Sequence, residues 1–125
     1  MKKLIVLLVF LISTIAFSQS KELISLHVFY LPTGITIEEF QNDLDRANKI
    51  YKKNGFGANK YKVYQVSLDD EAKEHRYMWL STWANDEEYN NAHSEEIDDF
   101  WDNYFTKKYK KMLDDHIYRK FFSVK

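Results

Sequence analysis

Two segments of the chain carry apolar side chains at both odd and even positions. They are residues 22–31 (ELISLHVFYL) and residues 75–84 (HRYMWLSTWA). A strand that is apolar on both alternating faces is typical of the centre of a sheet that is covered on both sides. We therefore predict that these two segments form the central strands of one sheet.

Two further segments are predicted to be strands, and both contain basic residues. They are residues 60–68 (KYKVYQVSL) and residues 116–124 (HIYRKFFSV). Basic side chains on an edge strand discourage pairing with foreign strands. We expect both segments at the sheet edges because of four residues: Lys60, Lys62, Arg119 and Lys120.

A first helix is predicted from about residue 36 to residue 53. Thr36 and Glu39 have the spacing of a capping box, in which the Thr hydroxyl accepts from the backbone N–H three residues later. Apolar residues recur at helical spacing after this box. Gly55 or Gly57 is the expected stop, because glycine readily adopts the left-handed conformation found there.

A long second helix is predicted to begin at Asn85 or Asp86, and Ser94 is a candidate bend or second cap. The order of elements is then β-α-β-β-α-β. Right-handed crossovers place the first and third strands in the centre of an antiparallel sheet. The sequence predicts the α+β class, as a ferredoxin-like sandwich.

Two helices cover only one face of a four-stranded sheet. The uncovered face of a lone subunit should alternate polar residues with apolar ones, and the central strands do not. We expect a homodimer packed sheet to sheet, which gives a dimeric α+β barrel. The alternatives are a monomer with an exposed aromatic face and a complex with a different protein.

The N-terminus has the pattern of a secretory signal peptide. Lys2 and Lys3 precede an apolar run from Leu4 to Phe17 that is short for a membrane span. We expect cleavage after residue 18, which leaves residues 19–125 as a single domain, exported to the periplasm or secreted. No membrane association is expected after the signal is removed.

Composition narrows the classes of function. Without Lys2 and Lys3, 16 of the 18 basic residues remain against 19 acidic ones. A net negative surface does not favour nucleic acid as a partner. The chain has no cysteine, and its histidines lack the spacing of metal ligands, so we expect neither a structural metal nor a bound cofactor.

One part of the sequence resembles a known superfamily. Residues 83–89 (WANDEEY), followed by Ala92 and His93, are similar to the junction of third strand and second helix in dimeric α+β barrel proteins. The antibiotic biosynthesis monooxygenase-like branch is the most similar. That resemblance implies a cofactor-independent oxygenase as one candidate activity. The superfamily also contains heme-degrading enzymes and heme peroxidases.

The heme-degrading branch has three characteristic residues, and this chain departs from all of them. His27, seven positions before Gly34, stands where that branch uses Asn. If Trp83 is aligned with the Trp that ends the strand, His93 occupies the place of a second Trp. Asn103 then occupies the place of the histidine that binds the heme iron.

Two histidines are the candidate catalytic residues. His27 lies in an otherwise mostly apolar strand, and His93 lies on the inner stripe of the second helix. A neutral histidine can take a phenolic proton or hold a ligand by a hydrogen bond. The alternative is that both are core histidines satisfied by backbone carbonyls. The expected substrate-binding walls are four aromatic residues: Trp83, Tyr89, Phe100 and Trp101.

The sequence thus predicts an exported protein that binds a small apolar or aromatic molecule. Oxidation of that molecule without a tightly bound metal is the activity implied by the resemblance. A non-catalytic binding or assembly module is the alternative, and heme carriage through His27 or His93 is the third hypothesis.

Overall fold

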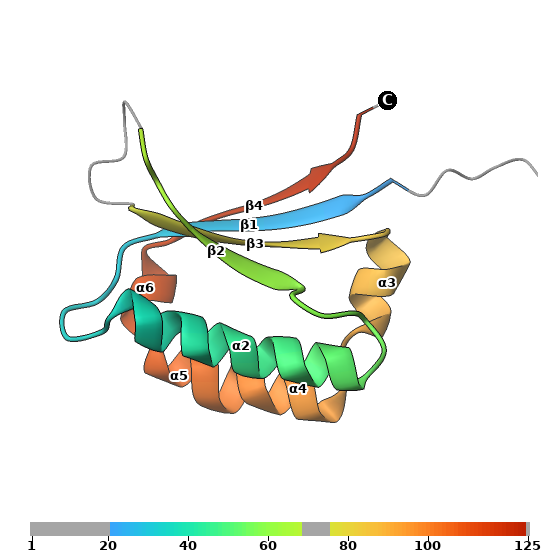
Figure 1. Cartoon of the computed structure of the whole chain (residues 1–125), viewed down its shortest axis with the longest axis horizontal. Helices are drawn as coiled ribbons and strands as arrows, with labels where there is room; N and C mark the ends of the chain where they lie inside the picture. The colour runs from blue at the N-terminus through green and yellow to red at the C-terminus, as the bar shows by residue number, and fades with distance from the viewer. Residues whose placement is uncertain (1–20, 69–75, 125) are drawn as a thin grey trace, which may run out of the picture.

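The fold is a four-stranded antiparallel sheet with every helix on one side (Figure 1). This computed structural model describes residues 21–68 and 76–124; the predicted signal peptide and the acidic turn at residues 69–74 lie outside them. The strands are β1 (Leu23–Phe29), β2 (Tyr61–Gln65), β3 (Tyr77–Trp83) and β4 (Ile117–Phe122). Their order is β2-β3-β1-β4. The predicted ferredoxin-like arrangement, with the first and third strands central, is confirmed.

Helix α2 (Ile37–Lys53) begins and ends where the sequence indicates. The Thr36 hydroxyl accepts from the backbone N–H of Glu39 at 3.1 Å, as a capping residue does. At the other end Gly55 adopts φ +87°. The N–H of Phe56 then bonds the Tyr51 carbonyl at 3.0 Å, which satisfies a carbonyl that the helix leaves free.

The second helical segment is interrupted several times. Asn85 caps the first piece by accepting from the Glu88 N–H at 2.7 Å, and Ser94 caps the second by accepting from the Ile97 N–H. The candidate cap at Ser94 is thus confirmed. The next piece is a π-helix, a wider turn that occurs often at functional sites. The pieces are α3 (Asp86–Asn91), α4 (Glu95–Asp99), η1 (Phe100–Phe105), α5 (Thr106–Lys108) and α6 (Lys110–Asp114).

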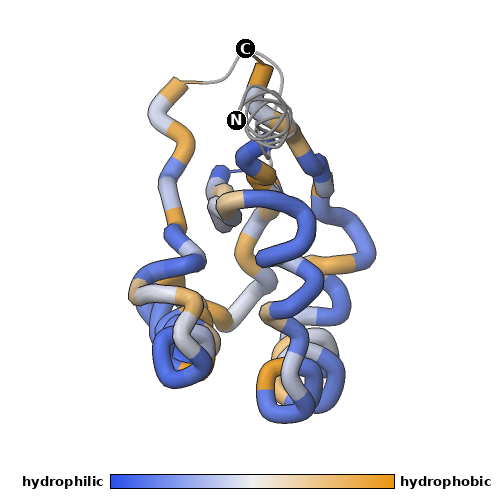
Figure 2. Tube along the Cα trace, turned by 90° about the vertical axis from the view of Figure 1, so that its right-hand side faces the viewer, coloured by the Kyte–Doolittle hydropathy of each residue, from blue (hydrophilic) through white to orange (hydrophobic). Residues whose placement is uncertain are grey.

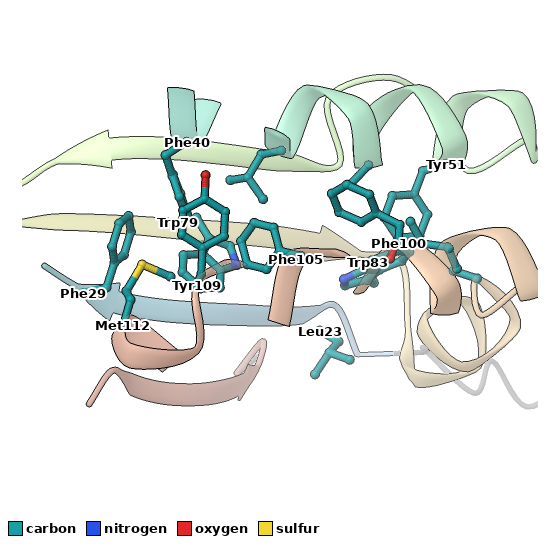
Figure 3. Close-up of a cluster of buried hydrophobic side chains, with 14 residues drawn as sticks. Leu23, Phe29, Phe40, Tyr51, Trp79, Trp83, Phe100, Phe105, Tyr109 and Met112 are labelled. Carbon is teal, nitrogen blue, oxygen red and sulfur yellow. The ribbon is translucent and has the colours of Figure 1, made fainter. Parts of the chain in front are cut away.

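The core lies between the sheet and these helices, which form two columns beneath the strands (Figure 2). Aromatic rings fill most of it (Figure 3). Phe40 of α2 meets Phe29 of β1 at 4.7 Å between ring centres, and Phe105 of η1 lies 5.7 Å from Phe40. Each such ring removes a large apolar area from water, which stabilises a domain that has no disulfide.

A buried carboxylate joins the two helical columns. Asp43 of α2 accepts hydrogen bonds from Tyr104, at 2.8 Å, and from Tyr109 and Lys108, both at 2.7 Å. Burial by itself raises the pKa of Asp43, but these hydrogen bonds and the Lys108 charge lower it below the ordinary value. The ionised Asp43 therefore fixes α2 against η1 and α5.

The opposite face of the sheet is largely apolar, and none of the described helices covers it (Figure 1). Strand register arranges this face, the outer face, in three rows across the sheet. They are Tyr64–Met78–Val28–Ile117, Lys62–Leu80–Leu26–Arg119 and Thr82–Ile24–Phe121. Phe121 and Tyr64 are 43% and 41% exposed. A contiguous apolar surface of this kind marks an interaction site.

None of the helices in the described part of the chain combines the length and apolar character that crossing a membrane requires.

Candidate functional site

A cavity of about 490 Å³ lies between the sheet and the second helical segment. The register explains its position. One inner row of the sheet consists of Tyr61, Ser81, Ser25 and Lys120, and the next consists of Val63, Trp79, His27 and Tyr118. Tyr61 of the first row and Trp79 and His27 of the second row line the cavity. Ser25 and Ser81 are buried, and Ser81 accepts a hydrogen bond from Trp83 Nε1 at 2.8 Å.

Both candidate histidines line this cavity, and three of the four predicted wall residues do as well. The sequence predicted a shared cavity for them, and the structure brings them to one. Their roles in binding or catalysis stay predictions. The lining residues are His27, Tyr51, Tyr61, Trp79, Trp83, Tyr89, His93, Asp98, Trp101, Asp102, Phe105, Thr106 and Leu113.

Phe100 is the wall residue that does not line the cavity. Side chains 98, 101, 102, 105 and 106 form one stripe of the second helical segment, and this stripe faces the cavity. Phe100 belongs to the neighbouring stripe with Tyr104, whose ring centre lies 5.6 Å away. There it packs near α2, with the Arg46 guanidinium 5.5 Å from its ring centre.

His27 lies on the helix-facing side of the sheet, in a stack of rings. Its ring centre is 4.1 Å from that of Trp79 and 4.9 Å from that of His116. Burial, and then the nearby charge of His116, lowers the pKa of His27 to about 3. A histidine with this pKa is neutral at pH 7 and is a weak base, which favours hydrogen bonding over proton abstraction.

One nitrogen of His27 is buried and has no hydrogen-bond partner among the described residues. This nitrogen is Nδ1. The alternative of a core histidine fully satisfied by backbone carbonyls therefore does not hold at this atom. A buried acceptor without a partner costs less than a buried donor without one, so we assign the proton of the neutral ring to Nε2.

His93 has a different environment at the rim of the cavity. Its side chain is 47% exposed, and Nδ1 lies 2.8 Å from the Asp98 carboxylate. Its ring meets Tyr89 edge to face at 5.5 Å, and Tyr89 in turn meets Trp83 at 5.4 Å. These contacts connect His93 to the aromatic wall.

Two tyrosines, Tyr51 of α2 and Tyr61 of β2, form another side of the cavity wall. Trp101 Nε1 donates to the Tyr51 hydroxyl at 3.0 Å, and Tyr51 stacks on Tyr61 at 5.6 Å. Burial raises the pKa of both tyrosines, so both hydroxyls stay protonated at neutral pH. On this side, the wall of the cavity is therefore polar at the two tyrosine hydroxyls but carries no charge.

Sequence reasoning missed several residues of this site. Trp79 shares a face of β3 with Trp83, and the period of two along a strand was a signal that could have found it. His116, at the start of the predicted strand 116–124, is partly buried and stacks on His27. Strand register, which joins β4 to β1, brings them together.

The residues present do not fit the heme-binding arrangement of the related branch. Asn103, at the place of the iron ligand, is not among the described residues that line the cavity. Its amide donates to Asp99 at 2.7 Å, and its oxygen accepts from Lys107 at 3.0 Å. Among the described residues, no group of three or more metal-ligating side chains is present either.

Comparisons with known proteins show the fold. A scan of protein families and a search of curated proteins find no match. Among solved structures, PA3566 from Pseudomonas aeruginosa is 12% identical, with a TM-score of 0.53, covering 85% of this chain and 96% of its own. This likeness and the strand order confirm the predicted ferredoxin-like fold.

Two other structures are similar to this chain. A dimeric ferredoxin-like protein of unknown function from Thermobifida fusca is 10% identical, covers 86% of this chain and 96% of its own, and has a TM-score of 0.48. SnoaB, a cofactor-independent oxygenase from Streptomyces nogalater, is 10% identical over 83% of this chain and 92% of its own, with a TM-score of 0.49.

Proposed function

We propose that this protein binds a small, largely apolar or aromatic molecule in the cavity beneath the sheet. The observation that carries the proposal is a space of about 490 Å³ whose walls are mostly aromatic side chains. Ligand sites are concave and combine mostly apolar walls with a few polar groups. Here the polar groups are His27 and the rim pair of His93 and Asp98.

Tryptophan fluorescence gives a direct test. The chain has three tryptophans, and all of them, Trp79, Trp83 and Trp101, line the cavity. Titration with the uncharged dye N-phenyl-1-naphthylamine should quench this fluorescence saturably, with one dye per subunit. Tyr89→Ala should weaken binding about fivefold, since an aromatic contact is typically worth roughly 1 kcal/mol.

Tyr64→Ala is the matched control, because Tyr64 lies on the outer face, away from the cavity. It should leave dye binding unchanged. Absence of saturable quenching in the unsubstituted protein would refute the proposal and favour the non-catalytic assembly module.

We also propose that a second copy of the chain covers the outer face. The two central strands place Ile24, Leu26 and Val28 on this face beside Met78 and Leu80. Two such faces packed together would remove the apolar rows from water, and the resulting isologous contact is the commonest kind in homodimers. Lys62 and Arg119 lie at opposite ends of the middle row, where they can remain hydrated.

Sedimentation velocity tests this arrangement. The unsubstituted protein should sediment as a dimer at micromolar concentration. Leu26→Asp, a charge in the middle row, should give a monomer with unchanged far-UV circular dichroism. Asn42→Asp, on the exposed side of α2, should stay dimeric. A monomeric unsubstituted protein contradicts the proposal.

Export is the remaining part of the proposed function. It is supported by the sequence of residues 1–18 alone.

A further inference from the structure

The aromatic walls of the cavity present a particular electrostatic surface. Seven of its thirteen lining residues are aromatic. The face of each such ring carries partial negative charge and attracts cations. The rings come from β2, β3 and both helical columns, so they border the space from several sides.

The formal charges of the lining side chains are negative, like the partial charge on the ring faces. Among the described residues that line it, none is a lysine or an arginine, and two are aspartates, Asp98 and Asp102. His93 offsets Asp98 in part when it is protonated. His27 adds no positive charge at neutral pH, because burial lowers its pKa to about 3. The lining side chains themselves therefore favour a cation over an anion.

The chain's own ammonium groups already contact two of these rings. Lys120 Nζ lies 4.0 Å from the ring centre of Tyr89, and Lys60 Nζ lies 4.3 Å from the ring centre of Trp83. Lys60 is neutralised by Glu88 at 3.1 Å, and Lys120 is exposed. Two of the wall rings thus already contact ammonium groups in this structure.

We propose that the cavity selects organic cations, meaning small molecules with an apolar or aromatic body and a protonated amine or quaternary ammonium group. This inference rests on the proposed ligand binding. The body lies among the rings near Trp79. The ammonium group lies toward Trp101, on the side where α4 and η1 bring Asp98 and Asp102.

A pair of probes of the same shape tests the inference. (3-Hydroxyphenyl)trimethylammonium and 3-tert-butylphenol differ in charge but hardly in size, and 3-hydroxybenzoate supplies the opposite charge. Each is used to displace N-phenyl-1-naphthylamine at pH 7 and physiological salt. The cation should bind at least fivefold more tightly than 3-tert-butylphenol, and the benzoate more weakly than both.

The outcomes separate the two proposals. If the dye binds but 3-tert-butylphenol displaces it as well as the cation does, the charge preference is refuted and ligand binding stands. If neither (3-hydroxyphenyl)trimethylammonium nor 3-tert-butylphenol displaces a bound dye, the charge preference is refuted as well. If the dye itself does not bind, the proposed function fails and this inference fails with it.

Substitutions identify the source of the preference. Asp98→Asn combined with Asp102→Asn should reduce the advantage of the cation over 3-tert-butylphenol at least threefold. Asp99→Asn is the control, since Asp99 lies on the same helical segment but does not line the cavity. It should retain the full preference. Equal losses in the double variant and the control would refute the role of these two aspartates.

Discussion

The buried, neutral state of His27 predicts a specific dependence of stability on pH. Its pKa is about 3 in the folded protein, against 6.5 for an unperturbed histidine. Between these two pH values the unfolded chain binds a proton that the folded chain does not. Stability must therefore fall as the pH falls from 6.5 toward 3, and the slope from this residue ends below pH 3.

The size of this effect follows from the two pKa values. At pH 4, the unfolded histidine is almost fully protonated and the folded one is almost fully neutral. The free energy of unfolding therefore falls by about 3 kcal/mol between pH 7 and pH 4, at about 1.4 kcal/mol for each pH unit below 6.5. That is a large part of the stability of a small domain.

His27→Phe removes the titrating group and retains a ring that can stack on Trp79. Urea unfolding of both proteins, followed by circular dichroism at pH 7, 6, 5 and 4, measures the difference. Other titrating groups, including Asp43, are present in both proteins, so their contributions largely cancel. The unsubstituted protein should lose about 3 kcal/mol more than the variant between pH 7 and pH 4.

If the free energy of unfolding falls equally with pH in the unsubstituted protein and in His27→Phe, this reasoning is refuted. A direct readout is the NMR signal of the His27 ring, which should not titrate between pH 7.5 and pH 5. Titration of that signal near pH 6.5 would show that the ring is hydrated.

Three further predictions concern other parts of the chain. Asp43→Asn should lower the free energy of unfolding by about 2–4 kcal/mol, because three donors lose a buried anionic acceptor. The exposed control Asp45→Asn should change it by less than about 0.5 kcal/mol, and urea unfolding measures both. Gly55→Ala should cost about 1 kcal/mol in the same assay, since an alanine is strained at a positive φ; an unchanged midpoint would contradict this. Intact mass of protein recovered from outside the cytoplasm should correspond to a chain beginning at Gln19, and a mass that includes Met1 would refute the predicted cleavage.

Local patterns in the sequence were sufficient for the elements and their order. The Thr36 cap, the Asn85 cap and the stop at Gly55 depend on residues within a few positions of each other, so they are readable without the fold. The central position of β1 was readable too, because a strand covered on both sides must be apolar on both faces.

Contacts between distant segments could not be read in this way. Whether Phe100 or Trp101 faces the cavity depends on how the interrupted second helical segment is rotated, and a residue in the wider π-turn shifts that rotation. The stack of His27 on Trp79 and His116 depends on the register of β1 with β3 and β4.

The sequence by itself determined the α+β class and the elements, because periodicity and capping act over one or two turns of chain, and the right-handed crossover rule then gave the strand order. The roles of His27 and His93 stay predictions. Only the tertiary structure decided that side chains of β1, β2, β3, α2 and the second helical segment border one cavity. The cavity, the pKa of His27 and the charges at the rim follow from that packing, since each depends on side chains that are far apart in the chain.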